Sequence, residues 1–435
     1  MENEVIGLLG IASLVLLLLL RMPIGIALIL VSFCGIWVLV GQRPAWGILS
    51  AVPYDFAAKW TLSSVPMFLL MGYVCYHTGL TKGLFDACRS WLARLPGGLA
   101  IASVFGSAGF AAVTGSSVAC AAAMGRIAIP EMLDKRYDPA LATGTIAAAG
   151  TLGALIPPSI LLILYGVFVE VPISKLFIGG VGAGLLTAAA YIAVILGRAS
   201  FNPSLAPRLT VMPPLVERLQ HLRETWPILL LVVAVLGGLF VGLFTATEAG
   251  AVGAGASMLI ALAKGSLTRK ALWQSLVETL ATTGTLFVIA VGANLLTRFL
   301  ALSGTAELIA GSVIGLEADV LVLILGISLL YLLLGMFLDP LGAMLLTLPV
   351  LLPILEKAQV DLIWFGVFLV KFLEIGMITP PIGINVFVIK GVVGNQVSLT
   401  TIFRGILWFL AADLVVVGLL VAFPEIITFL PSQME

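Results

Sequence analysis

Two stretches of this chain place oxygen-bearing side chains and prolines inside otherwise apolar sequence. Such residues can supply oxygen ligands to an ion. The first reads TGSS from Thr114 to Ser117 and is followed by a proline pair, Pro157 and Pro158. Proline lacks the backbone N–H, so a proline pair leaves carbonyl oxygens of the preceding turn without helical partners. Hydroxyl oxygens and free carbonyls together suit Na⁺, and the N-terminus of a half-helix favours an anionic group. These residue types predict a site for Na⁺ and for an anionic substrate.

The second stretch repeats the first at a distance of 223 residues. It contains FLDP, whose carboxylate is Asp339, and a second proline pair, Pro380 and Pro381. A shift of 223 lays Ser116 on Asp339 and the first proline pair on the second. In each copy an apolar stretch is interrupted in the way that broken helices are interrupted at the centre of secondary transporters. The sequence therefore predicts a duplicated unit.

Each candidate residue also has a structural interpretation, which stays open at this point. Ser, Thr and Gly are also common where membrane helices pack closely. Asp339 could cap a helix, or its charge could be balanced by a cation or a proton. Glu374 and Lys371 stand at helical spacing and could pair with each other, whereas Glu248 and Arg298 are interpreted as structural or inter-repeat contacts. The predicted substrate ligands are Thr114, Ser116, Ser117, Pro157, Pro158, Ser159, Thr379, Pro380, Pro381 and Asn385. The predicted Na⁺ ligands are Ser116, Ser117, Gly153, Asp339, Gly376 and Thr379.

The composition indicates the environment that these residues occupy. Hydrophobic residues make up 61% of the chain, charged residues 10%, and the mean hydropathy is +1.18. Such a chain needs a lipid bilayer as its solvent, so an all-α polytopic membrane protein is expected. The formal charge is zero and suggests no nucleic-acid partner. The sequence contains no phosphate-binding loop and no H-E-x-x-H motif, so neither an ATP-driven pump nor an intramembrane protease is indicated, and no enzyme activity is expected.

Hydropathy predicts ten crossings and two re-entrant hairpins. The hairpins, 98–132 and 318–355, are interrupted by TGSS and LDP, and arms of about 15 residues are too short to cross easily. The predicted spans are 5–20, 23–40, 61–80, 141–171, 176–197, 227–243, 246–263, 272–300, 362–393 and 403–423.

Basic residues predict the orientation of these spans. With the N-terminus outside, twelve lysines and arginines fall in cytoplasmic loops and four fall outside, as the positive-inside rule requires. The first hairpin then enters from the cytoplasm and the second from outside, so the repeats are inverted. The cytoplasmic set is Lys82, Arg89, Arg94, Lys135, Arg136, Arg198, Arg208, Arg218, Arg223, Lys264, Arg269 and Lys270; the outer set is Arg43, Lys59, Lys175 and Lys357.

The duplication divides the chain into two repeats, 1–196 and 226–435, joined by a cytoplasmic linker, 197–225. The linker is rich in proline and is not expected to fold alone. Broken helices are expected at 141–171 in the first repeat and 362–393 in the second. Two stretches with apolar and charged residues at helical spacing, Leu80–Leu95 and Leu267–Leu280, are expected to lie flat on the cytoplasmic interface. The alternative is that they are simple juxtamembrane loops.

The segments 95–166 and 374–391, which contain AAVTGSSVACAAAMG, GTLGALIPPSI and EIGMITPPIGINVF, resemble the large membrane subunit of tripartite ATP-independent periplasmic (TRAP) transporters. The resemblance covers nearly the whole chain. It implies an elevator-type, Na⁺-driven importer that takes organic acid anions, of the dicarboxylate, sugar acid or keto acid type, from a periplasmic substrate-binding protein. The family's sodium-binding segments correspond here to the TGSS and FLDP tips and to 153–159 and 376–385.

The resemblance also implies a small four-helix membrane subunit as a partner, the bacterial inner membrane as the location, and no cofactor beyond Na⁺ as coupling ion. Since the chain ends soon after its last span, that subunit is expected to be a separate polypeptide. The main alternative is an inverted-repeat Na⁺/dicarboxylate symporter that works alone. Dependence on a binding protein distinguishes the two.

Overall fold

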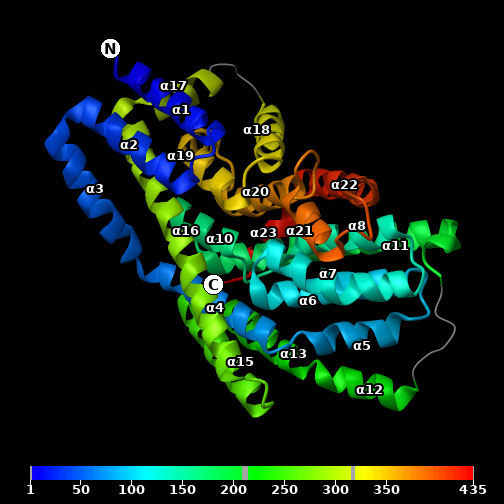
Figure 1. The fold of residues 1–435 in the computed structure, drawn as a ribbon. Helices are drawn as coiled ribbons and strands as arrows, with labels where there is room; N and C mark the ends of the chain where they lie inside the picture. Colours follow the sequence, from blue (N-terminus) through cyan, green and yellow to red (C-terminus); the bar gives the residue numbers. More distant parts are fainter. Residues whose placement is uncertain (1, 208–213, 315–318, 435) are drawn as a thin grey trace.

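The computed structural model describes residues 2–207, 214–314 and 319–434, and over these residues it is all-helical, with turns and no β-strand (Figure 1). Each of the ten predicted spans coincides with a helix or with a helix interrupted at its middle. Long apolar runs allow no other membrane structure, because lipid offers no partner for exposed backbone groups. Within the described part of the chain, seven helices have the length and apolar composition to cross a membrane. The predicted class of polytopic α-helical membrane protein is confirmed.

Helices α1 (Asn3–Leu19), α2 (Ile24–Val40), α4 (Ser64–His77), α15 (Ala246–Ala263) and α16 (Arg269–Ser303) pack together near the N-terminus, and we call this group the frame. α16 packs along α2 and α4, while α15 packs on α4 and α1 on α2. Figure 1 shows α16 running obliquely across the length of this group. First-repeat and second-repeat helices are therefore interleaved here.

The two predicted hairpins are present. α6 (Gly98–Thr114) turns back into α7 (Ser117–Asp134), and α18 (Val320–Gly335) turns back into α19 (Pro340–Lys357). Their arms have 17, 18, 16 and 18 residues, slightly more than the 15 expected. Both α19 boundaries lie 223 residues after those of α7, so the repeat seen in the sequence also sets the helix boundaries.

Each repeat also contains the predicted broken helix. In the first, α8 (Pro139–Gly150) and α9 (Leu152–Leu155) stop before the proline pair, and α10 (Ile160–Val169) resumes after it. In the second, α20 (Leu362–Gly376) stops and α21 (Ile384–Val393) resumes. The bond within each proline pair is cis. Missing N–H groups end the helices at these points, which leaves uncoiled backbone inside the protein.

One expectation about a connecting segment is wrong, and the linker is partly helical. The stretch 267–280 is not a separate flat helix, because it continues without a break into the 35-residue α16. The linker 197–225 contains helix α12 (Leu215–Glu224), which packs on the predicted amphipathic helix α5 (Lys82–Leu92). The leucines of α12 stand at helical spacing, and a helix this short is stable because its apolar face packs on α5. Part of the linker, residues 208–213, lies outside the described residues.

The remaining elements complete the chain. Hydropathy alone did not predict α3, which runs between the second and third spans. The bounds are α3 Gln42–Ala57, η1 Trp60–Ser63, α11 Ile173–Phe201, η2 Pro203–Leu205, α13 Trp226–Val232, a π-helical turn Val233–Gly237, α14 Gly238–Phe240, α17 Thr305–Ile314, α22 Leu399–Ala422 and α23 Glu425–Ser432.

Candidate functional site

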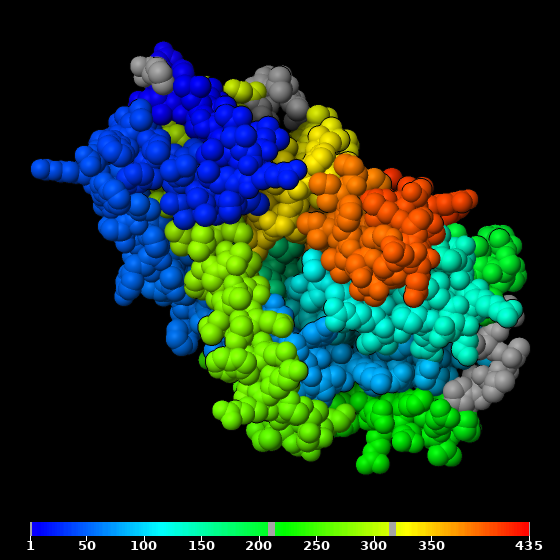
Figure 2. Space-filling view, viewed as in Figure 1, coloured from blue at the N-terminus to red at the C-terminus, as the bar shows by residue number. Residues whose placement is uncertain are grey.

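The tips of the two hairpins meet at one cavity of about 160 Å³. Figure 2 shows a hollow between α16, the cyan segment of the first hairpin and the orange segment of the second broken helix. A polar cavity of this size has room for an ion together with a carboxylate group. The lining residues are Gly115, Ser116, Ser117, Val118, Ala154, Ile160, Leu161, Thr282, Leu286, Asp339, Pro340, Leu341, Glu374 and Met377.

Two helices of the first repeat begin at this cavity with a serine cap. The Ser116 hydroxyl accepts a hydrogen bond from the Ala119 N–H of α7 at 3.4 Å. The Ser159 hydroxyl accepts one from the Leu162 N–H of α10 at 3.3 Å. Helix N-termini carry partial positive charge and N–H groups without helical partners. Both therefore make the cavity attractive to an anion.

Asp339 caps the third helix that begins here. Its carboxylate accepts from the backbone N–H groups of Leu341 and Gly342, each at 3.1 Å, at the start of α19. The capping interpretation is thus confirmed for one carboxylate oxygen. The same residue lines the cavity, so its charge also faces the space in which an ion would bind.

Backbone segments approach each other closely around both tips because glycine leaves room. A Cβ on Gly115 would lie 2.4 Å from the Pro158 carbonyl oxygen, and one on Gly153 would lie 2.6 Å from the Ser116 carbonyl oxygen. Gly115 also has φ +63°, a left-handed backbone that glycine adopts without strain. In the second repeat, a Cβ on Gly376 would lie 2.6 Å from the Cα of Gly335. Each tip is therefore seated against the broken helix of its own repeat.

Glu374 joins the second broken helix to the first tip. Its carboxylate is fully buried and accepts a hydrogen bond from the Ser117 hydroxyl at 2.5 Å. Its other oxygen, Oε1, is buried without a partner among the described residues. An unpaired buried carboxylate oxygen is costly, so it marks a position where a cation would be stabilised.

The suggested pairing of Lys371 with Glu374 is wrong. Lys371 instead contacts Asp413 of α22 at 2.5 Å, and both side chains are fully buried. Asp413 also accepts from the Tyr191 hydroxyl at 2.9 and 3.0 Å. Asp413 was missed although its position in an apolar span was a detectable signal, since an intramembrane carboxylate needs a partner.

The side chains that line the tip cavity carry only negative charge. Among the described residues that line it, Asp339 and Glu374 are acidic and none is basic. Among the described residues, no three His, Cys, Asp or Glu side chains form a group able to hold a metal ion. Any cation bound here would therefore take hydroxyl and carbonyl oxygens besides the carboxylates, a donor set that suits Na⁺.

A second cavity of about 200 Å³ adjoins the first and shares Ser116, Ile160 and Thr282 with it. Thr114 lines this second cavity, and its hydroxyl donates to the Phe110 carbonyl at 2.9 Å. The Tyr73 and Thr282 hydroxyls lie 2.8 Å apart. The two cavities together provide hydroxyl groups for a ligand longer than one carboxylate. The other side chains that line the second cavity include Tyr76 and Glu278.

The remaining predicted residues occupy different places. Nine of the predicted residues line neither cavity: Gly153, Pro157, Pro158, Ser159, Gly376, Thr379, Pro380, Pro381 and Asn385. The Thr379 hydroxyl donates to the Ile375 carbonyl at 2.7 Å, and the Asn385 amide is buried without a partner among the described residues.

The two charged residues interpreted as structural also lie away from the tips. Glu248 closes a capping box with Thr245 at the start of α15. Arg298 borders a separate cavity beside Lys59 and Glu170.

Comparison with known proteins identifies relatives over most of the chain. The family model described as tripartite ATP-independent periplasmic transporter, DctM component, matches residues 11–426. The chain is 34% identical over 382 residues to the C4-dicarboxylate TRAP transporter large permease protein DctM of Pseudomonas aeruginosa, covering 87% of this chain and 86% of that protein. It is 30% identical over 447 residues to the sialic acid TRAP transporter large permease protein SiaM of Vibrio cholerae, covering 99% and 98%.

A third relative is longer. The sialic acid TRAP transporter permease protein SiaT of Haemophilus influenzae is 32% identical over 395 residues, covering 89% of this chain and 63% of that protein. The chain therefore matches less than two thirds of SiaT.

Two solved structures share the fold at low sequence identity. The YdaH transporter of Alcanivorax borkumensis has a TM-score of 0.61 at 15% identity, covering 89% of this chain and 90% of that one. MtrF of Neisseria gonorrhoeae has a TM-score of 0.58 at 14% identity, covering 100% and 95%.

Proposed function

Because the chain belongs to the DctM component family of the tripartite ATP-independent periplasmic transporters, we propose that it is the large membrane permease of a Na⁺-coupled importer of organic acid anions. The observation that carries this proposal is the charge of the tip cavity. Three helix N-termini attract an anion there, while Asp339 and Glu374 repel it.

A cation removes this conflict. Na⁺ beside Asp339 and the free oxygen of Glu374 would offset both carboxylates and leave the helix N-termini to hold a substrate carboxylate. Ion and substrate then bind more tightly together than either does alone, which is the thermodynamic requirement for coupling. The serine hydroxyls and the backbone around Gly153 and Gly376 would supply the remaining oxygen ligands.

The substrate class follows from the same charges. Sialic acid and C4-dicarboxylates, which the names of the relatives specify, both carry a carboxylate. We propose the same class for this chain, delivered by a periplasmic substrate-binding protein at the bacterial inner membrane with a small membrane subunit alongside. The tip cavity borders α16 of the frame through Thr282 and Leu286, so movement of the tips against α16, as in an elevator, would open the site to one side at a time.

The proposed function is tested by reconstituting the chain with its small subunit and binding protein in vesicles. We expect uptake of radiolabelled succinate or sialic acid when Na⁺ is high outside and the binding protein is present. Uptake should stop when K⁺ replaces Na⁺ or when the binding protein is omitted. Full uptake without binding protein would favour the stand-alone symporter, and uptake indifferent to Na⁺ would refute the coupling.

Asp339→Asn separates the charge of this residue from its capping role. Asparagine also caps helices, so insertion should stay normal, while loss of the negative charge weakens ion binding. We expect the Na⁺ concentration for half-maximal uptake to rise about tenfold, equivalent to about 1.4 kcal/mol. Asp361→Asn is the matched control, because Asp361 caps α20 through Ile363 and Trp364 outside both cavities. Equal Na⁺ dependence in the two variants would reduce Asp339 to a helix cap.

A further inference from the structure

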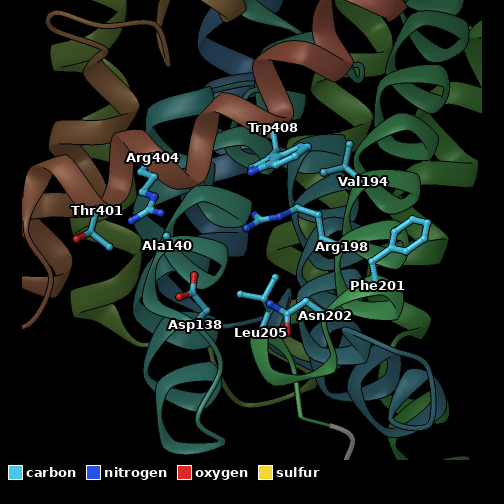
Figure 3. A pocket seen from close by; sticks show the side chains of 11 residues that line it. Asp138, Ala140, Val194, Arg198, Phe201, Asn202, Leu205, Thr401, Arg404 and Trp408 are labelled. Atoms are coloured by element: carbon cyan, nitrogen blue, oxygen red, sulfur yellow. The ribbon is translucent and has the colours of Figure 1, made fainter.

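A cavity of about 720 Å³ lies away from the hairpin tips, where α11 ends beside the starts of α8 and α22 (Figure 3). It shares no lining residue with the two cavities of the transport site. Figure 3 shows Arg198 and Arg404 pointing into the same space from α11 and α22, with Asp138 opposite them. A volume of this size is typical of a small-molecule site.

The cavity carries an excess of positive charge. The Arg198 guanidinium lies 5.2 Å from the Trp408 ring centroid, and its Nη1 is buried without a hydrogen-bond partner among the described residues. No ion pair or hydrogen bond of the described residues engages Arg404. A buried guanidinium N–H that lacks a partner is costly, so the site is built to receive an acceptor.

Asp138 offsets only part of this positive charge. One of its carboxylate oxygens accepts from the Leu141 N–H at 2.9 Å and so caps α8. It is the only acidic residue among the lining residues, against two arginines and the positive end of a 12-residue helix. The net field inside the cavity therefore favours an anion.

The surroundings identify the kind of anion. The side chains of Phe201 and Trp408 at the rim are 94% and 54% exposed, and Leu407 and Leu414 on α22 are 56% and 69% exposed. Exposed aromatic residues beside arginine are typical of the membrane–water interface. A soluble anion needs no apolar wall, whereas a phospholipid has acyl chains that would cover α22.

We propose that this cavity binds the phosphate of an anionic phospholipid headgroup, held by Arg198 and Arg404, with the acyl chains along the exposed face of α22. The exposed Lys135 and Arg136, which precede Asp138, and the predicted cytoplasmic side of this end fit the anionic leaflet of the membrane. The lipid would join α11 of the first repeat to α22 of the second, outside the ion and substrate site.

The experiment titrates the purified full chain in neutral detergent with dioleoylphosphatidylglycerol, dioleoylphosphatidylcholine or inorganic phosphate, and counts bound lipid by native mass spectrometry. We expect phosphatidylglycerol to bind at least about tenfold more tightly than phosphatidylcholine. Arg404→Gln should weaken phosphatidylglycerol binding about tenfold, the factor that corresponds to one lost charge-assisted contact. The double variant Arg198→Gln/Arg404→Gln should lose the preference.

Arg218→Gln is the matched control, because Arg218 stacks on Trp91 at 4.3 Å in the same way but outside this cavity. It should bind phosphatidylglycerol as the wild type does. Arg404 is exposed, so its replacement leaves folding intact and the result interpretable. Unchanged phosphatidylglycerol binding in the double variant, an equal loss in Arg218→Gln, or inorganic phosphate that displaces the lipid at equal concentration would each overturn the proposal.

Discussion

Gly115→Val will abolish substrate uptake at every Na⁺ concentration. The new Cβ would lie 2.4 Å from the Pro158 carbonyl oxygen, a distance that only movement of the backbone can relieve. The φ of +63° adds about 1–2 kcal/mol of strain for a residue with a Cβ. The tip then withdraws from the broken helix, and the oxygen ligands of both elements no longer face one cavity.

The expected kinetics distinguish this variant from Asp339→Asn. Raising Na⁺ should restore uptake when only an ion ligand is weakened, but should not restore it when the tip is displaced. The matched control is Gly418→Val on α22, where an added Cβ meets nothing within 4 Å. It should insert and transport as the wild type does. Measurable uptake by Gly115→Val in reconstituted vesicles would show that the close approach of tip and broken helix is not required.

Asp413→Leu should produce the largest loss of stability. It leaves the buried Lys371 ammonium without its partner at 2.5 Å, and breaking one side of a buried ion pair costs about 3–5 kcal/mol. The Tyr191 ring, 5.6 Å from the lysine nitrogen, then remains beside that charge but cannot replace the carboxylate. Lys371→Met should cost less, because Asp413 keeps its hydrogen bond from Tyr191.

The double variant Lys371→Met/Asp413→Leu tests the pairing itself. It removes both charges, so most of the lost stability should return. The measurement is the apparent Tm of the detergent-solubilised protein, read by scanning fluorimetry for the wild type and the three variants. If the double variant unfolds at the temperature of Asp413→Leu, the two side chains are not energetically coupled.

The features that sequence reasoning predicted well are local. Proline pairs end helices wherever they stand, so both broken helices and the residues at which they break follow from composition. The apolar runs and the 223-residue repeat likewise predict the helix boundaries of the two hairpins. Ser116 was identified from an equally local feature, a hydroxyl oxygen inside an apolar stretch.

Long-range partners were not predictable in this way. Glu374 and Lys371 stand one helical turn apart, and spacing alone suggested that they pair; the fold instead brings Ser117 to one and Asp413 to the other. These contacts join residues 257 and 42 positions apart in the chain. The sequence of a single helix does not reveal which side chains from distant helices will contact it in the folded protein.

The sequence by itself determined that this chain is a membrane protein, that it is duplicated, and where its helices break. The hydropathy of a segment and the missing N–H groups of proline depend only on residues that are near one another in the chain. Only the tertiary structure decided that both hairpin tips share one cavity, that two carboxylates and no basic residue line it, and that Asn385 and the second proline pair lie outside it. It also decided that Arg198 and Arg404 share a separate cavity. These outcomes depend on how distant helices pack, and packing selects among many arrangements that local patterns leave equally possible.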